Sequence, residues 1–240
     1  ENPQLIAFES MEKTFSKQEN VYFYIHAKHG DLFTNKGLSL IETLTDEGWE
    51  LPYSQKVTSL QNYQHTEAED DELMIDYLYY DATELNENDL QRIKKIAFSE
   101  PTLLHRLISE DGASSGINVR TVLPEGTTMR TSKEAVIAAR ALADQIRPNF
   151  PEFEILVGGS LTSNVTMGEA IKQDIENLLG LSYLVMIITM VILLRTFSGM
   201  LLTLMVISFS VLSTMGLFGW LGFTMTPPTG FVPTAILTIA

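Results

Sequence analysis

Charged side chains stop three-quarters of the way along this 240-residue chain. Glu176 is the last acidic residue, and Arg195 is the only charged residue after it. The part up to Asn177 carries all 30 Asp and Glu residues and 15 of the 16 Lys and Arg residues. A surface helix of a soluble protein keeps a polar face, so long uncharged segments indicate burial in hydrocarbon. The sequence therefore predicts an acidic soluble part followed by a membrane part.

The uncharged part divides into three apolar segments, 178–194, 200–223 and 231–240. A bilayer core is crossed by about 20 mostly apolar helical residues, with a range of roughly 17–25. The first two segments reach this length, and the third begins apolar and stops at the end of the sequence. Because the chain also starts with Glu1, we expect it to be a fragment of a longer membrane protein. A buried helical hairpin in a soluble core is disfavoured, since neither long segment has a charge for a polar face.

The residues Arg195-Thr-Phe-Ser-Gly199 are enough only for a tight turn between the first two spans. Positively charged residues prefer the cytoplasmic side in short loops, whereas long translocated domains are not subject to this bias. We therefore expect Arg195 on the cytoplasmic side and residues 1–177 on the extracytoplasmic side.

The soluble part alternates segments of strand and helix character. Aromatic and β-branched residues predict strands at 20–27, 56–60 and 153–158. Apolar residues at helical spacing predict helices at 35–47, 88–98 and 131–146. We expect the first helix to end at Gly48, and the third to begin at an N-cap, Thr131 or Ser132, and to end at Pro148.

Two further segments complete the soluble part. Residues 103–124 contain two apolar runs around Glu110-Asp111-Gly112, which is typical of a β-hairpin. Residues 73–80 fit either an extended segment or a turn of helix. Without the extra segments, the order is strand, helix, strand, strand, helix, strand. This order predicts an α+β ferredoxin-like (split βαβ) fold, with an antiparallel sheet and two helices on one face.

The predicted domain boundaries follow from these segments. We expect a soluble domain at 1–165, a stalk helix at 166–177 and an all-α transmembrane bundle segment at 178–240. Gly158-Gly159 releases the chain into this helix, and Gly180 is the only helix breaker between residues 170 and 195. The stalk helix is therefore expected to run directly into the first span.

No catalytic, cofactor-binding or metal site is predicted, and the chain is not expected to be an enzyme. His26 and His29 would lie on different faces of a strand and lack further ligands. The acidic run 67–72 lacks the spacing and central glycine of a calcium loop, so a solvated loop is favoured. Asn164-Val-Thr166 matches the glycosylation pattern, and 156–161 lacks the lysine of a phosphate loop. The chain lacks the clustered Lys and Arg residues that bind nucleic acid.

Two features of the apolar part bear on function. Thr226-Pro-Pro-Thr-Gly230 breaks the helix between the second and third segments. It is interpreted as an interfacial connector, with substrate gating as the alternative. Intramembrane ionisable residues usually mark ion pathways, and these segments have none at mid-membrane depth. Any proton relay is therefore expected outside this sequence.

Three motifs resemble the resistance–nodulation–division (RND) superfamily, in its branch of exporters with an MMPL-type domain. Gly48-Trp-Glu-Leu-Pro-Tyr53, followed by Val57-Thr-Ser-Leu-Gln-Asn-Tyr-Gln-His65, resembles the first porter-domain motif. Leu107-Ile-Ser-Glu-Asp-Gly112 is similar to the hairpin of that domain. Residues 231–240, FVPTAILTIA, are similar to the start of the fourth transmembrane helix.

The resemblance implies that residues 1–177 form the first extracytoplasmic porter domain. The three apolar segments then correspond to transmembrane helices 2, 3 and the start of 4. Such proteins are proton-motive-force-driven exporters of lipids and other hydrophobic molecules in the bacterial inner membrane, as multi-pass proteins. Their relay carboxylates belong to helix 4, beyond Ala240.

The partners implied are the lipid bilayer, a hydrophobic or lipid-like substrate, and a second half of the same chain. A homo-oligomer or a periplasmic partner is also compatible with the resemblance. The competing function is a membrane-anchored extracytoplasmic sensor with a separate signalling module. A protein-translocation accessory subunit or a sterol-sensing relative is a further alternative within the superfamily.

Overall fold

In the computed structural model, residues 2–15, 19–69, 72–124 and 129–222 are described. The chain divides into two compact units, Glu1–Val165 and Thr166–Ala240. The first unit holds most of the charged residues of the chain, and the second holds the apolar segments.

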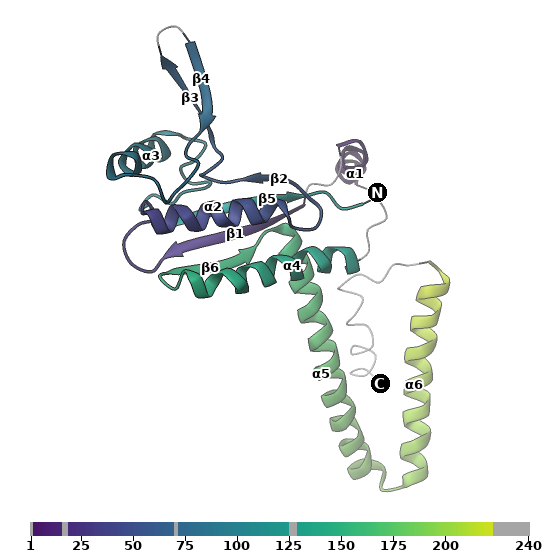
Figure 1. Cartoon of the computed structure of the whole chain (residues 1–240). Helices are drawn as coiled ribbons and strands as arrows, with labels where there is room; N and C mark the ends of the chain where they lie inside the picture. Colours follow the sequence, from purple (N-terminus) through teal and green to yellow (C-terminus); the bar gives the residue numbers. More distant parts are fainter. Residues whose placement is uncertain (1, 16–18, 70–71, 125–128, 223–240) are drawn as a thin grey trace. The chain divides into compact units, whose positions relative to one another are not determined.

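A four-stranded sheet forms the centre of the first unit (Figure 1). Its strands are β1 (Glu19–Ala27), β2 (Ser54–Thr58), β5 (Ser114–Thr121) and β6 (Phe153–Gly158). Their spatial order is β2-β5-β1-β6, and every neighbouring pair is antiparallel. Phe23 in β1 lies opposite Ile117 in β5 on one side and Val157 in β6 on the other. The two central strands are therefore β1 and β5, which are far apart in the sequence.

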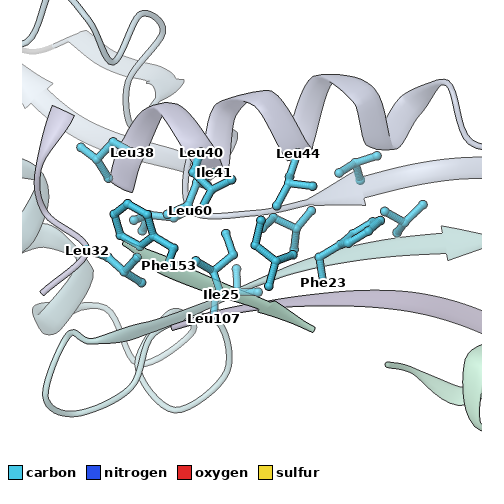
Figure 2. Packing of buried hydrophobic residues seen from close by; sticks show 14 of the residues in the cluster. Phe23, Ile25, Leu32, Leu38, Leu40, Ile41, Leu44, Leu60, Leu107 and Phe153 are labelled. Carbon is cyan, nitrogen blue, oxygen red and sulfur yellow. The ribbon is translucent and has the colours of Figure 1, made fainter. Parts of the chain in front are cut away.

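The helices α2 (Asn35–Trp49) and α4 (Met129–Ile146) pack against the sheet. Val21, Phe23 and Ile25 alternate along β1 and are completely buried, because successive strand side chains point to opposite faces. Figure 2 shows the α2 side chains packed over Phe23 and Ile25. The α2 residues in this layer are Leu38, Leu40, Ile41 and Leu44, and α4 adds Ala135, Val136, Ala139 and Ala143 to the same core. One face of the sheet thus supplies the hydrophobic core.

The remaining elements of the first unit lie outside this sheet. They are α1 (Pro3–Phe15), the antiparallel pair β3 (Gln64–Glu69) and β4 (Glu72–Tyr77), α3 (Glu87–Ser99) and a 3-10 turn at Arg147–Asn149. Asn86 caps α3: its side chain accepts hydrogen bonds from the backbone N–H groups of Asn88 and Asp89, and the Asp89 carboxylate accepts one from the N–H of Asn86. Helix α3 buries Leu90 and Ile93 in the core of the unit.

Among the described residues of the second unit, all regular secondary structure is helical. Helix α5 (Ser160–Leu194) extends without a break from the first unit into the second, and α6 (Phe197–Trp220) follows after two residues. In the described part, α6 is long and apolar enough to cross a membrane, and Leu184–Leu193 of α5 is apolar but shorter. The predicted segment 231–240 and the loop 226–230 lie outside the described residues.

Most of the predicted elements are confirmed, and the first unit is a mixed α/β unit with a sheet and helices. The three expected strands correspond to β1, β2 and β6, and the three expected helices to α2, α3 and α4. Residues 73–80, for which two conformations were open, are mostly strand β4. The continuous helix through Gly180 is also present.

The predicted end of the first helix at Gly48 is wrong. Helix α2 includes Gly48 and continues to Trp49, with Glu50 as its C-cap. A Cβ atom at Gly48 would lie 3.2 Å from Val119 Cγ2 in β5. The glycine therefore permits a close approach of helix and sheet. From the sequence alone, a glycine with this role looks the same as a glycine that ends a helix.

The predicted hairpin at 103–124 is wrong in its first arm. Only the second arm is a strand, β5, while residues 103–108 form turns with isolated bridges. The turn at Gly112 does exist, with φ +69°, and Ser109 N–H donates to the carbonyl oxygen of Ser114. The antiparallel partners of β5 are β1 and β2.

Three smaller corrections concern the ends and loops of the soluble unit. Thr131 and Ser132 lie inside α4, which begins at Met129, so neither is its N-cap. The acidic run was expected to be a loop, but Glu67 and Glu69 belong to β3 and Glu72 belongs to β4. Helix α1 was not predicted, because its residues lack a clear apolar face.

Candidate functional site

The sheet face opposite the core carries an aromatic row from β1. Tyr22, Tyr24 and His26 alternate with the buried core residues and point away from them. The Tyr24 and His26 rings stack, with centroids 6.5 Å apart and planes 8° from parallel. In the described part of the unit, α2 and α4 pack against the opposite, buried face.

Hydrogen bonds fix the row against β5 and the loop before it. The Tyr24 hydroxyl and the Ser114 hydroxyl are 2.7 Å apart, and Ser114 Oγ lies 2.9 Å from His26 Nδ1. The Tyr22 hydroxyl donates to the backbone carbonyl of Arg106 at 3.1 Å. Tyr22 reaches this carbonyl across Gly116, where a Cβ atom would lie 1.6 Å from the tyrosine oxygen. Gly116 is therefore needed for the observed position of Tyr22.

A pocket of about 220 Å³ opens between these tyrosines and the loop at 105–109. It is lined by the two tyrosines, by His105 to Ser109, and by Ser114, Ser115 and Gly116. Burial raises the pKa of the Tyr22 hydroxyl, and the neighbouring Tyr24 raises it further. Tyr22 therefore stays neutral and acts as a hydrogen-bond donor at physiological pH.

A second functional feature is the connection from β6 to α5. Gly159 has φ +98°, and a Cβ atom there would lie 2.5 Å from the Asn20 carbonyl oxygen. Asn20 and Ser160 are joined by three hydrogen bonds: Asn20 N–H donates to Ser160 Oγ, and Asn20 Oδ1 accepts from both the N–H and the hydroxyl of Ser160. The Asn20 amide also donates to Asn118 Oδ1 at 2.7 Å. The start of α5 is thus bound to the central strands of the sheet.

The first turns of α5 belong to the hydrophobic core of the first unit. Leu161 and Val165 are completely buried in the same cluster as the sheet. The helix then continues for the rest of its 35 residues to Leu194. Beyond Gly180 its described large side chains are mostly exposed, as expected for residues that face lipid. One continuous helix therefore starts in a packed core and ends in an apolar segment.

Arg195, the only charged residue of the apolar part, lies in the turn between α5 and α6. Arg195 has φ +53°, a left-handed conformation typical of the residue that ends a helix. Its N–H donates to the carbonyl oxygen of Val191 at 3.3 Å. Thr196 is the N-cap residue of α6. The predicted tight turn at 195–199 is therefore confirmed, and it is shorter than expected.

The structure does not bring the residues considered as metal ligands together. His26 is held by Ser114 on the open sheet face, and His29 is exposed in the bend after β1. The described residues contain no group of three His, Asp or Glu side chains that could hold a metal ion. Asn164 and Thr166 lie within α5, and residues 156–161 form the connection described above.

Sequence reasoning missed the pocket and the Asn20–Ser160 contacts. The alternation of Tyr22 and Tyr24 with buried residues was visible in the sequence and indicated a face of its own. Nothing in the sequence pairs Tyr22 with Arg106, because 84 residues separate them. The same holds for Asn20 and Ser160, which are 140 residues apart.

Comparison with known proteins completes these observations. A model of the MMPL family matches residues 4–239, which include both compact units. No curated protein matches the chain.

Proposed function

This chain belongs to the MMPL family of RND-superfamily membrane exporters, and from that premise we propose that it drives export with the proton motive force. Its cargo would be lipids or other hydrophobic compounds, moved out of the cytoplasmic membrane. The observation that carries the proposal is the family match, which runs through the soluble unit, α5 and α6 without interruption. A sensor with an unrelated signalling module would not need this combination.

In this proposal the first unit is a porter domain with the ferredoxin-like, split βαβ fold. The strand order β2-β5-β1-β6, the antiparallel pairings and the contribution of α2 and α4 to one core support that assignment. Residues 166–177 of α5 would be the stalk, and 178–240 would belong to a transmembrane bundle. The open sheet face would be the surface available to cargo.

Helix α5 would couple the membrane part to the porter domain. A helix transmits movement when both of its ends are held and its backbone hydrogen bonds are unbroken. Asn20 and Ser160 hold the first turn, and Leu161 and Val165 bury the next. A shift of the transmembrane bundle would then reach the sheet through a single rigid element.

The proposal assigns no catalytic step and no cofactor to this chain. Its partners would be the lipid bilayer, a hydrophobic or lipid-like substrate and a second half of the same protein, which would supply further spans. The relay carboxylates would lie beyond Ala240. A homo-oligomer or a periplasmic partner would complete the export path.

The proposed topology in the bacterial inner membrane can be tested with single cysteines, since the chain has none of its own. We expect Lys95→Cys, an exposed position in α3, to react with a membrane-impermeant maleimide in spheroplasts. Thr196→Cys, beside Arg195, is expected to react only after the membrane is permeabilised, because positive residues prefer the cytoplasmic side. Labelling of Thr196→Cys in intact spheroplasts would reverse the orientation.

The function itself is tested by export from cells that make the complete transporter. We expect a fluorescent lipid analogue to leave loaded cells faster than it leaves cells without the protein. A protonophore should reduce export to the level of the control cells, because coupling would be lost. Export that persists unchanged with the protonophore would contradict proton coupling, and no difference from the control cells would favour the sensor or accessory-subunit alternatives.

A further inference from the structure

The pocket beside Tyr22 and Tyr24 has the chemistry of a ligand-binding site. We propose that it binds a molecule in which an oxyanion group, such as a phosphate, is attached to a small ring or short apolar segment. The identification of this molecule as part of the cargo rests on the proposed export function. The binding itself does not, and it can be measured without transport.

The charge of the pocket opposes that of the unit around it. Residues up to Asn177 carry 30 acidic and 15 basic side chains, yet Arg106 and His105 line this pocket. The Arg106 side chain is exposed, and no hydrogen bond or ion pair joins its guanidinium group to any described residue. The nearby Glu110 carboxylate faces His105, at 3.6 Å from Nε2. A planar guanidinium without a partner is suited to two-pronged binding of an oxyanion.

The other walls of the pocket suit a ring. Tyr22 and Tyr24 line it with their aromatic side chains, and the Tyr22 ring lies over Gly116. Aromatic faces pack well against rings and short apolar groups. The volume of about 220 Å³ corresponds to roughly seven water molecules at about 30 Å³ each. This space holds a small ring with one oxyanion group, whereas a long acyl chain would have to extend outside.

The hydroxyl groups at the pocket are already hydrogen-bonded. Ser114 Oγ lies 2.7 Å from the Tyr24 hydroxyl and 2.9 Å from His26 Nδ1, and the Tyr22 hydroxyl donates to the Arg106 carbonyl. Arg106 therefore supplies the donor for a ligand oxygen. A cation is the alternative guest for two tyrosine rings. Arg106 disfavours it, because its guanidinium group would repel a positive charge.

The test uses the full chain in a neutral maltoside detergent, with phenyl phosphate as the probe in isothermal titration calorimetry. We expect saturable binding of phenyl phosphate, and no saturable binding of benzyl alcohol or phenyltrimethylammonium. Arg106→Ala should weaken binding by at least about tenfold, because a charge-assisted hydrogen bond is lost. Arg130→Ala is the matched control: it removes an exposed arginine from α4, so its affinity should equal that of the unmodified chain.

The proposal is overturned if the unmodified chain shows no saturable binding, or if both arginine variants weaken binding equally. Saturable binding of phenyltrimethylammonium alone would also overturn it. Dihexanoyl phosphatidic acid distinguishes the sources of the ligand. Displacement of phenyl phosphate by this short lipid identifies a lipid headgroup, whereas failure to displace it identifies a free soluble oxyanion. If the unmodified chain binds phenyl phosphate but the cells that make the transporter show no export, only the proposed function is contradicted.

Discussion

Replacing Gly159 with alanine is expected to lower the free energy of unfolding of the soluble unit by about 3 kcal/mol. The residue has φ +98°, which L-amino acids with side chains rarely adopt. The new Cβ atom would also lie 2.5 Å from the Asn20 carbonyl oxygen and 2.9 Å from the Tyr22 backbone nitrogen. Relief of these contacts requires the strand and the start of α5 to separate. The hydrogen bonds between Asn20 and Ser160 would then be lost as well.

The adjacent glycine provides the control for this experiment. A Cβ atom at Gly158 would have its nearest neighbour at 3.9 Å, an ordinary contact, so Gly158→Ala should cost less than about 1 kcal/mol. Urea unfolding can be followed by the fluorescence of Trp49 in a Trp220→Phe background, since the chain has two tryptophans. Equal unfolding midpoints for the two alanine variants would contradict the strain assigned to Gly159.

Replacing Leu178 with proline is expected to abolish export while leaving the soluble unit folded. Residue 178 lies in the interior of α5. Proline removes a backbone hydrogen bond there and its ring clashes with the preceding turn, which costs about 3 kcal/mol and kinks the helix. If α5 transmits movement from the membrane part, the kink would absorb that movement before it reaches Asn20 and Ser160. Export should fall to the level seen with a protonophore.

The control for this variant is Leu178→Ala, which removes the same side chain but keeps the helix. Its export should remain close to that of the unmodified protein at equal amounts in the membrane. The Trp49 unfolding midpoint should be the same in both variants, because position 178 lies outside the first unit. If the proline variant exports as well as the alanine variant, α5 is only a tether.

These two substitutions test different parts of the connection between the sheet and the membrane segment. Gly159 acts within the first unit, where Leu161 and Val165 are buried. Leu178 lies further along the same helix, at the start of the segment without charge. A defect in stability is therefore expected for the first, and a defect in export without loss of stability for the second.

The local elements of the soluble unit could be predicted from the sequence because their signals are local. Strand β1 was recognised by its aromatic and β-branched residues, and α2 by the spacing of Leu38, Leu40, Ile41 and Leu44. The hairpin at 103–124 was misread because a turn at Gly112 does not reveal which strands flank it. Strand β5 pairs with β1 and β2, whose positions are set by burial of the whole sheet.

The candidate site was largely hidden for the same reason. Tyr22 and Tyr24 could be assigned to the outer face of a strand, but their neighbours Arg106 and Ser114 come from a distant part of the chain. No periodicity links residues that are more than 80 positions apart. Arg106 can be recognised as part of a candidate site only once the pocket that it lines is known.

The sequence by itself determined where charged residues stop and which segments are apolar. These properties depend on composition, because the cost of placing charge in hydrocarbon acts on each residue separately. The tertiary structure decided the strand order, the contact of Asn20 with Ser160 and the conformation that requires glycine at position 159. These depend on which distant segments meet, and that is settled by the burial of the complete core.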